Sequence, residues 1–272
     1  EVSLNVSRAS VRGSESNAGN MIADSFLYMY EQYSNTNGME PVIALQNGGG
    51  IRQNAGDVLS GTISQRNTMD VLPFSNLLSV VQSVTPTDTK GILEHSADRL
   101  PDLGGQFLQV AGFTVTYSLQ NDVGSRVVSV ELKDGTKIIE NGAIVNGAPS
   151  VTVITNSFVA RGGDGYSQFG DNPNQSTLRD DSGTFIFYER AWREYLQTLP
   201  VSGNPALPTV LASDPRYQPG GEGRITIIPA DVTAIDLAEL NSSGTSVPVW
   251  PLAVGMMLIS LGLLSIARRR TL

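Results

Sequence analysis

The sequence predicts an α+β domain, with a mixed β-sheet and packed helices, followed by a C-terminal transmembrane helix. Three observations lead to this fold class. Short apolar and β-branched runs, such as residues 41–45 and 151–155, are typical of buried strands. Longer segments, such as residues 14–33, carry apolar residues at helical spacing. Finally, the uncharged run at residues 247–267 is long enough to cross a bilayer.

Three longer segments are predicted to be helices, because apolar residues recur on one face of each. Ser14 or Ser16 suits the N-terminal cap of the first helix, and Pro86 fits the first turn of the second. We expect the apolar stripe of the first helix to pack in the core. The predicted helices cover residues 14–33, 85–100 and 183–199, and a loop with a short helix is expected at residues 57–70.

Seven segments are predicted to be strands, because they are short and are apolar or rich in β-branched residues. Asp134 and Gly135 form a turn signal between two of them, so these two are expected to pair as a hairpin. The predicted strands cover residues 41–45, 77–84, 113–119, 126–132, 136–139, 151–155 and 224–228.

Composition limits the classes of function. The 272 residues carry 18 basic and 26 acidic side chains, a net charge of −8, which argues against a nucleic-acid-binding protein. A small phosphorylated ligand stays compatible with this charge, since it needs only a few arginines. The sequence has no cysteine, which excludes disulfides and thiolate metal sites. The one histidine, His95, lies in a predicted helix, where we expect a structural role, with a catalytic role as the alternative.

The C-terminal segment is predicted to anchor the chain in a membrane. A polar linker, residues 231–246, follows the predicted domain of residues 1–230. The 21 uncharged residues 247–267 span about 31 Å as a helix, which matches the apolar core of a bilayer. Three arginines, residues 268–270, follow this run within the tail of residues 247–272 and are expected to stay in the cytoplasm. The domain would then be exported, to the periplasm or the cell surface; a buried core helix is the alternative.

A glycine-rich segment after the first predicted strand is a candidate anion-binding site. Residues 47–52 read Asn-Gly-Gly-Gly-Ile-Arg, and three glycines at a strand end let the backbone approach a ligand closely. Arg52 adds a guanidinium, which suits a carboxylate or a phosphate. Arg8 and Arg12 lie beside the start of the first predicted helix, where anions are also favoured. The alternative is a tight glycine turn with surface arginines.

Five motifs follow one another along the predicted domain. They are Arg12 with Glu15, Gly19 and Asn20; residues 47–52; Pro73, Phe74, Ser75 and Asn76; residues 104–107 (Gly-Gly-Gln-Phe); and residues 158–166 (Phe-Val-Ala-Arg-Gly-Gly-Asp-Gly-Tyr). In this order they resemble the C-terminal, substrate-binding domain of the 5′-nucleotidase / UDP-sugar hydrolase family. The resemblance covers about residues 8–228 and implies the α+β fold of that domain. One glycine-rich turn would be a weak signal, whereas the ordered set is specific.

The resemblance implies a role for each matching residue. Phe74 and Phe158 would stack on the two faces of a nucleobase, which suits aromatic rings and any base. Without the resemblance, both would be interpreted as core aromatics. Asp164 would accept hydrogen bonds from ribose hydroxyls. The other implied contacts are Arg8, Arg12 and Arg52 with the phosphates, Asn47 and Asn76 with the nucleoside, and Gly105 as a lining residue.

The sequence departs from the family in its metal chemistry. Family enzymes hydrolyse phosphate esters at a two-metal centre of His, Asp and Asn residues in an N-terminal domain. With one histidine, this chain is expected to bind no metal cofactor itself. We expect the divalent metal pair in an N-terminal metallophosphatase domain, in the same or a neighbouring gene product. Because the chain begins at Glu1, without a Met or a signal peptide, we expect a fragment of a longer product.

Two functions stay open at this point. The first is the nucleotide-recognition part of an exported 5′-nucleotidase-type hydrolase, with ligands of the AMP or UDP-sugar class. The second is a stand-alone surface protein that binds nucleotides without catalysis, and the gene sequence upstream of Glu1 distinguishes the two. The tail, with Pro248 and Pro251 before the apolar run and arginines after it, resembles the C-terminal sorting signals of Gram-negative bacterial surface proteins. A plain tail anchor is its alternative.

Overall fold

The computed structural model describes residues 2–34, 40–170, 172–203 and 207–230, and Glu1–Ala230 form one compact unit. The predicted linker and membrane tail, residues 231–272, lie outside the described residues. Within the described part of the chain, no helix combines the length and the apolar composition needed to cross a bilayer.

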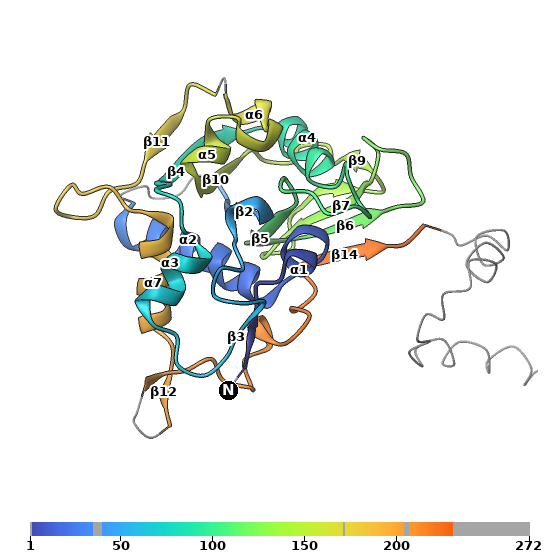
Figure 1. Cartoon of the computed structure of the whole chain (residues 1–272). Helices are drawn as coiled ribbons and strands as arrows, with labels where there is room; N and C mark the ends of the chain where they lie inside the picture. The colour runs from blue at the N-terminus through green and yellow to red at the C-terminus, as the bar shows by residue number, and fades with distance from the viewer. Residues whose placement is uncertain (1, 35–39, 171, 204–206, 231–272) are drawn as a thin grey trace, which may run out of the picture. The chain divides into compact units, whose positions relative to one another are not determined.

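Two five-stranded sheets form the framework of this unit (Figure 1). The first sheet holds the candidate site at one of its edges. Its strands lie in the order β11 (Gln175–Thr177), β4 (Leu78–Val84), β10 (Val151–Asn156), β2 (Val42–Asn47) and β5 (Leu108–Ala111). Only β10 and β2 pair in parallel, and the other neighbours are antiparallel.

The second sheet is mixed as well. Its strands lie in the order β14 (Ile225–Ile228), β6 (Phe113–Ser118), β7 (Val127–Leu132), β8 (Lys137–Glu140) and β9 (Ala143–Ile144). Here β14 and β6 are parallel, and β7 and β8 form the hairpin that the Asp-Gly turn predicts. The α+β class with mixed pairing is confirmed, but the described residues form two such sheets where the sequence predicted one.

The first sheet is buried on both faces. Successive side chains of each strand point to opposite faces, so one strand contributes to two cores. On β2 and β10, Ala44 and Ile154 pack with helices α2 (Asn17–Tyr33) and α7 (Tyr188–Gln197). Their neighbours Ile43 and Val153 pack with α4 (Pro86–Ser96) and with the second sheet. The sheet therefore separates two hydrophobic cores, which fixes the register of its strands.

Several short helices and two-stranded sheets lie in the segments between the two large sheets and the long helices. Ser16 caps α2, and the two arginines that precede this helix lie on a separate helix, α1. Three-residue 3₁₀ helices follow the ends of β2 and α5. These elements are α1 (Arg8–Gly13), α3 (Gln65–Val71), α5 (Ser157–Ala160), α6 (Ser167–Gly170), the 3₁₀ helices η1 (Gly48–Gly50), η2 (Gly163–Gly165) and η3 (Pro215–Tyr217), and the strand pairs β1 (Leu4–Asn5) with β3 (Val58–Leu59) and β12 (Val201–Ser202) with β13 (Leu207–Pro208).

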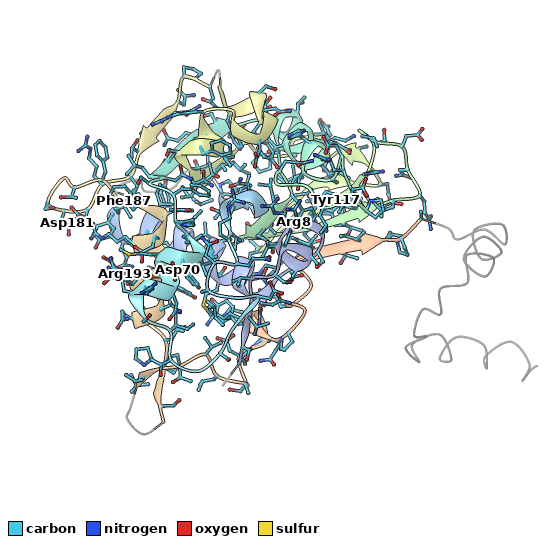
Figure 2. The ribbon with its side chains drawn as sticks, in the orientation of Figure 1. Arg8, Asp70, Tyr117, Asp181, Phe187 and Arg193 are labelled. Atoms are coloured by element: carbon cyan, nitrogen blue, oxygen red, sulfur yellow. The ribbon has the colours of Figure 1, made fainter. Side chains whose placement is uncertain are left out.

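The helix predicted at residues 183–199 begins later than expected, at Tyr188. The Asp180 carboxylate accepts the backbone N–H groups of Ser182 and Thr184, and this turn holds the preceding segment out of the helix. Phe187 does not join the helix and forms an antiparallel bridge with Leu77, which directly precedes β4. Figure 2 labels Phe187 and Asp181.

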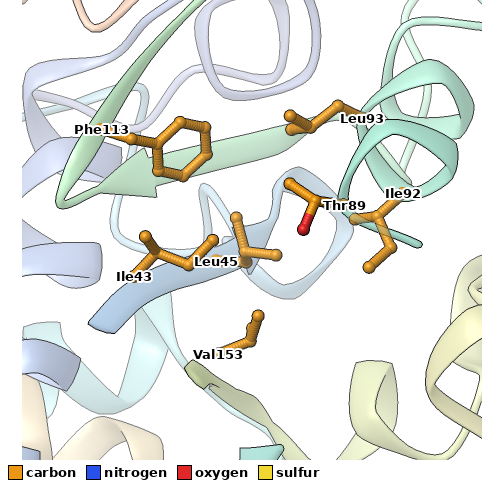
Figure 3. A pocket seen from close by; sticks show the side chains of 7 residues that line it. All are labelled: Ile43, Leu45, Thr89, Ile92, Leu93, Phe113 and Val153. Atoms are coloured by element: carbon orange, nitrogen blue, oxygen red, sulfur yellow. The ribbon is translucent and has the colours of Figure 1, made fainter. Parts of the chain in front are cut away.

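A small cavity of about 10 Å³ lies in the core between α4 and the first sheet (Figure 3). Ile43, Leu45 and Val153 line it from the sheet side, and Thr89 lines it from α4. The Thr89 hydroxyl is buried, and no described residue forms a hydrogen bond with it. An unpaired buried hydroxyl costs stability, because it has lost its hydrogen bonds to water.

Replacing this hydroxyl with a methyl group should therefore stabilise the fold. We expect Thr89→Val to raise the free energy of unfolding by about 1 kcal/mol, because the unpaired group is removed at constant volume. Thr155→Val is the matched control, since the Thr155 hydroxyl is equally buried but donates to the Leu45 carbonyl oxygen at 2.8 Å. It should lower the free energy of unfolding by about 1 kcal/mol. Urea unfolding of both variants tests this, and shifts of the same sign would contradict it.

Candidate functional site

Four chain segments meet at one edge of the first sheet. Because β2 and β10 are parallel, their last residues, Asn47 and Asn156, lie at the same edge. β4 and β5 are antiparallel to them and begin at that edge, where Leu78 pairs with Asn156 and Leu108 pairs with Asn47. The loops before β4 and β5 and the turns after β2 and β10 are therefore neighbours, although they lie far apart in the sequence.

These segments enclose a pocket of about 410 Å³. Its volume falls in the range of small-ligand sites. Eight of the nine predicted site residues line it, and Gly49 and Gly50 complete the lining. The exception is Arg8, labelled in Figure 2, which is exposed on α1. The eight are Arg12, Asn47, Arg52, Phe74, Asn76, Gly105, Phe158 and Asp164.

Positive charge gathers at one part of the pocket. Burial, followed by the nearby charges of Arg8 and Arg52, lowers the pKa of the Arg12 guanidinium, while Asp164 raises it. The Arg12 Nε atom is buried without a hydrogen-bond partner. Among the described residues, no carboxylate forms an ion pair with any of the three arginines. Guanidinium groups that repel one another and form no ion pair are suited to binding an anion.

The two phenylalanines of the pocket are exposed, which corrects the core position that the residues alone suggest. Phe74 and Phe158 have 41% and 44% of their surface accessible. The Arg52 guanidinium lies 5.1 Å from the Phe74 ring centre. Phe158 lies in the first turn of α5, and the Asn156 side chain caps this helix by accepting the Phe158 N–H at 3.1 Å. Exposed rings in a pocket offer faces for stacking a flat ligand.

Asp164 and Asn47 form the polar centre of the pocket. Asn47 Nδ2 donates to Asp164 Oδ2 at 2.7 Å. Asn47 Oδ1 accepts hydrogen bonds from the side-chain amides of Gln46 and Asn156, at 3.1 and 3.0 Å, so its orientation is fixed. The second carboxylate oxygen, Asp164 Oδ1, accepts no hydrogen bond from the described residues. It is therefore available to a hydroxyl donor of a ligand.

Sequence reasoning missed the two buried amides that orient Asn47. Gln46 and Asn156 are the polar residues at the ends of β2 and β10, and both are fully buried. Their only signal in the sequence was a polar side chain at or near the end of a predicted apolar strand. Asn76 lines the pocket, and its backbone carbonyl accepts the Tyr188 N–H at 3.0 Å.

The glycines allow the loops to approach one another. Gly48 and Gly49 donate their N–H groups to the carbonyl oxygens of Phe107 and Gly105, each at 2.7 Å. A Cβ atom at Gly48 would lie 2.2 Å from the Val11 carbonyl oxygen, which is far inside van der Waals contact. The glycine-rich segment thus brings α1 and the loop before β5 against the end of β2.

Metal ligands do not gather in the described part of the chain. No group of three or more His, Cys, Asp or Glu side chains there could hold a metal ion. The chemistry that the pocket residues can supply is stacking, hydrogen bonding and anion binding.

Sequence comparison relates the chain to nucleotide hydrolases. The model of the family described as "5′-nucleotidase, C-terminal domain" matches residues 1–171. The trifunctional nucleotide phosphoesterase protein YfkN of Bacillus subtilis (strain 168) is 35% identical over 212 residues, which cover 77% of this chain and 13% of that protein. The 5′-nucleotidase of Homo sapiens is 33% identical over 183 residues, which cover 67% of this chain and 31% of that protein. The chain thus spans about a third or less of the length of these relatives.

Solved structures show the same fold. The 5′-nucleotidase precursor from Thermus thermophilus matches with a TM-score of 0.63 and 31% identity, over 84% of this chain and 38% of that one. The NAD nucleotidase of Haemophilus influenzae matches with a TM-score of 0.52 and 20% identity, over 81% of this chain and 37% of that one.

The close contact at Gly48 predicts a position that tolerates no side chain. We expect Gly48→Ala to lower the free energy of unfolding by about 1–3 kcal/mol, because its Cβ would meet backbone that has no room to move. Gly105→Ala is the control, since its Cβ would lie 3.5 Å from the nearest atom, Asp164 Oδ2. That substitution should change the free energy of unfolding by less than about 0.5 kcal/mol. Equal losses in urea unfolding would show that the tight approach at Gly48 is unimportant.

Proposed function

Because the chain belongs to the 5′-nucleotidase C-terminal domain family, we propose that its pocket is the nucleotide-recognition site of an exported 5′-nucleotidase-type phosphoester hydrolase. One observation carries the proposal. A single pocket combines two exposed phenylalanine rings, an aspartate with a free oxygen, and arginines that form no ion pair with a described residue. A nucleoside monophosphate has a flat base, a pair of hydroxyls and an anion, so it has one group for each of these features.

The base is proposed to stack between Phe74 and Phe158. The rings belong to different parts of the chain, one in the loop before β4 and one after β10, and both line the same pocket. Stacking of a base on an aromatic ring contributes about 1–3 kcal/mol and tolerates any base. Burying the exposed rings against the ligand would add an apolar contribution.

The sugar is proposed to bind beside the Asn47–Asp164 pair. The free Asp164 oxygen would accept a hydrogen bond from a ribose hydroxyl, and Asn47 holds the carboxylate in place. Asn76 and Gly105 would complete the contacts with the nucleoside.

The phosphate is proposed to bind at Arg12 and Arg52, with Arg8 at the rim. A bound anion would raise the pKa of Arg12, which burial and then the charges of Arg8 and Arg52 lower, so the site favours a charged ligand over a neutral one. Hydrogen bonds between guanidinium and phosphate are charge-assisted and hence strong.

Hydrolysis is proposed to take place at a metal pair held by a separate metallophosphatase domain. Such a pair activates water and stabilises the charge that develops on the phosphate. The part proposed for this chain is to bind and orient the nucleotide. Export and anchoring through residues 247–272 stay part of the proposal, supported by the uncharged run and the three arginines after it.

Calorimetric titration of the 272-residue chain with adenosine and AMP tests the binding site. We expect Phe158→Ala to weaken both ligands about 10-fold or more, because stacking is lost for either. Arg52→Ala should weaken AMP about 10-fold more than adenosine, because a charge-assisted contact with phosphate is lost. Phe185→Ala is the control for an exposed phenylalanine, since Phe185 stacks with Arg179 away from the pocket. A folded chain that binds neither adenosine, AMP nor UDP-glucose would refute the proposal.

Removing metal ions provides a separate test. We expect AMP affinity to be unchanged by EDTA, within about twofold, because guanidinium groups and not a cation bind the phosphate here. The chain with added magnesium, manganese or zinc should release no phosphate from AMP. A tenfold loss of affinity in EDTA, or metal-dependent phosphate release, would contradict the proposed division of roles.

A further inference from the structure

We propose that His95 is a positioning residue for Asp164. It would hold the backbone of the turn at residues 162–166, so that the Asp164 carboxylate stays directed at the sugar hydroxyls. This inference rests on the proposed function and adds to it a residue that lies outside the pocket lining.

Asp164 has a backbone conformation that needs outside support. Its φ and ψ angles are 55° and 16°, in the left-handed region that residues with a side chain seldom adopt. Gly163 and Gly165 flank it, and glycine does not restrict the backbone. The turn therefore has little local preference for the observed conformation. A strained residue of this kind persists only where its surroundings fix it.

His95 supplies this outside support through a hydrogen bond to the backbone of the turn. Its Nε2 atom lies 2.7 Å from the Asp164 carbonyl oxygen. A carbonyl oxygen only accepts hydrogen bonds, so Nε2 carries the proton and donates it. The His95 ring also packs edge-on against Tyr166, with ring centres 4.9 Å apart. A Cβ atom at Gly165 would lie 2.8 Å from Nε2, so the glycine is what lets the ring reach the backbone.

His95 is itself held by a closed set of contacts. Its Nδ1 atom lies 3.1 Å from Asp98 Oδ2, and Asp98 Oδ1 accepts the Gln106 amide at 2.6 Å. The Gln106 carbonyl accepts the Tyr166 hydroxyl. Tyr166 is two residues after Asp164, so the contacts run from α4 through the loop before β5 and back to the turn. These contacts hold the ring at its Nε2 atom and place the Asp98 carboxylate beside its Nδ1 atom.

The proposed role does not depend on the charge of the ring. The Nε2–H donor is present in the neutral tautomer protonated at Nε2 and in the imidazolium. The carboxylate that faces the Nδ1 atom of the ring is that of Asp98. The contact with Asp164 is made in both forms.

Two hydrogen bonds thus hold Asp164 at different atoms. Asn47 binds its carboxylate, and His95 binds its carbonyl oxygen. The backbone of Phe158 has a contact of its own, because the Asn156 side chain accepts the N–H groups of Phe158 and Val159, although the Phe158 ring packs against Gly163 of the turn. Loss of the His95 contact should therefore weaken recognition of the sugar hydroxyls and leave base stacking intact. A merely structural role would weaken all ligands alike.

Titration of the 272-residue chain with adenosine and 2′,3′-dideoxyadenosine separates these cases. The ratio of the two Kd values measures how much the sugar hydroxyls contribute. For the unchanged chain we expect a ratio of about 10 or more, as for hydrogen bonds to a charged group. His95→Phe keeps a ring against Tyr166 but lacks the donor. For this variant we expect the ratio of the two Kd values to fall to about 3 or less, because only recognition of the hydroxyls is lost. The Kd of 2′,3′-dideoxyadenosine should stay unchanged.

A pair of amide variants serves as the matched control. The side-chain nitrogen of His95→Gln reaches the place of Nε2, so this variant should keep most of the ratio. That of His95→Asn reaches only the place of Nδ1, so it should behave like His95→Phe. Unchanged binding of 2′,3′-dideoxyadenosine shows in each case that the pocket is folded.

Each contrary outcome has a distinct meaning. If the unchanged chain distinguishes the two ligands and both His95→Phe and His95→Asn still do so, the role of His95 is wrong and the proposed function stands. Equal weakening of both ligands by His95→Phe would also overturn it. If the unchanged chain binds both ligands equally well, the sugar role of Asp164 fails, and this inference fails with it. Binding of neither ligand would overturn the proposed function itself.

Discussion

The parallel pairing of β2 with β10 is the constraint on which the site depends. It brings the ends of two strands more than a hundred residues apart to one sheet edge, where Asn156 donates to Asn47 and Asn47 donates to Asp164. The antiparallel neighbours β4 and β5 begin at the same edge and contribute the loops with Phe74 and Gly105. Two hydrophobic cores hold this register from opposite faces of the sheet. The pocket is thus a consequence of sheet topology, because the loops and turns that line it follow or precede the central strands at one edge.

The arginines and the glycine-rich segments around the pocket suit the binding of a small anion. The protein as a whole is acidic, with a net charge of −8, yet Arg12 and Arg52 lie together in the pocket and form no ion pair with any described residue. Keeping such charges unpaired costs stability in the free protein, and a bound phosphate would offset that cost. The glycine-rich segments let the loops come close enough to place the arginines, the aspartate and the aromatic rings around one ligand-sized volume.

Much of this was predictable from the sequence, and the failures have physical causes. Hydrophobic periodicity predicted the longer helices α2, α4 and α7 and seven of the fourteen strands in the described part of the chain, because a half-buried helix and a buried strand leave clear patterns. It missed β5, whose Gln109 is buried and donates to the backbone at Val11 and Ser14, so the strand does not look apolar. The residues alone did not predict that Phe74 and Phe158 are exposed. Only the family resemblance carried by the ordered motifs implied that both rings face a ligand. The contact of His95 with Asp164 spans 69 residues and leaves no local signal. The predictions for the membrane tail concern residues outside the described part of the chain.

The central claim is that one pocket binds a base between two phenylalanine rings and the phosphate at the arginines. A crystal structure of the chain with AMP tests it most directly. We expect the base to lie between Phe74 and Phe158, with the phosphate oxygens within hydrogen-bonding distance of Arg12 or Arg52. AMP bound elsewhere on the molecule, or bound in the pocket with the base away from both rings, would contradict the claim.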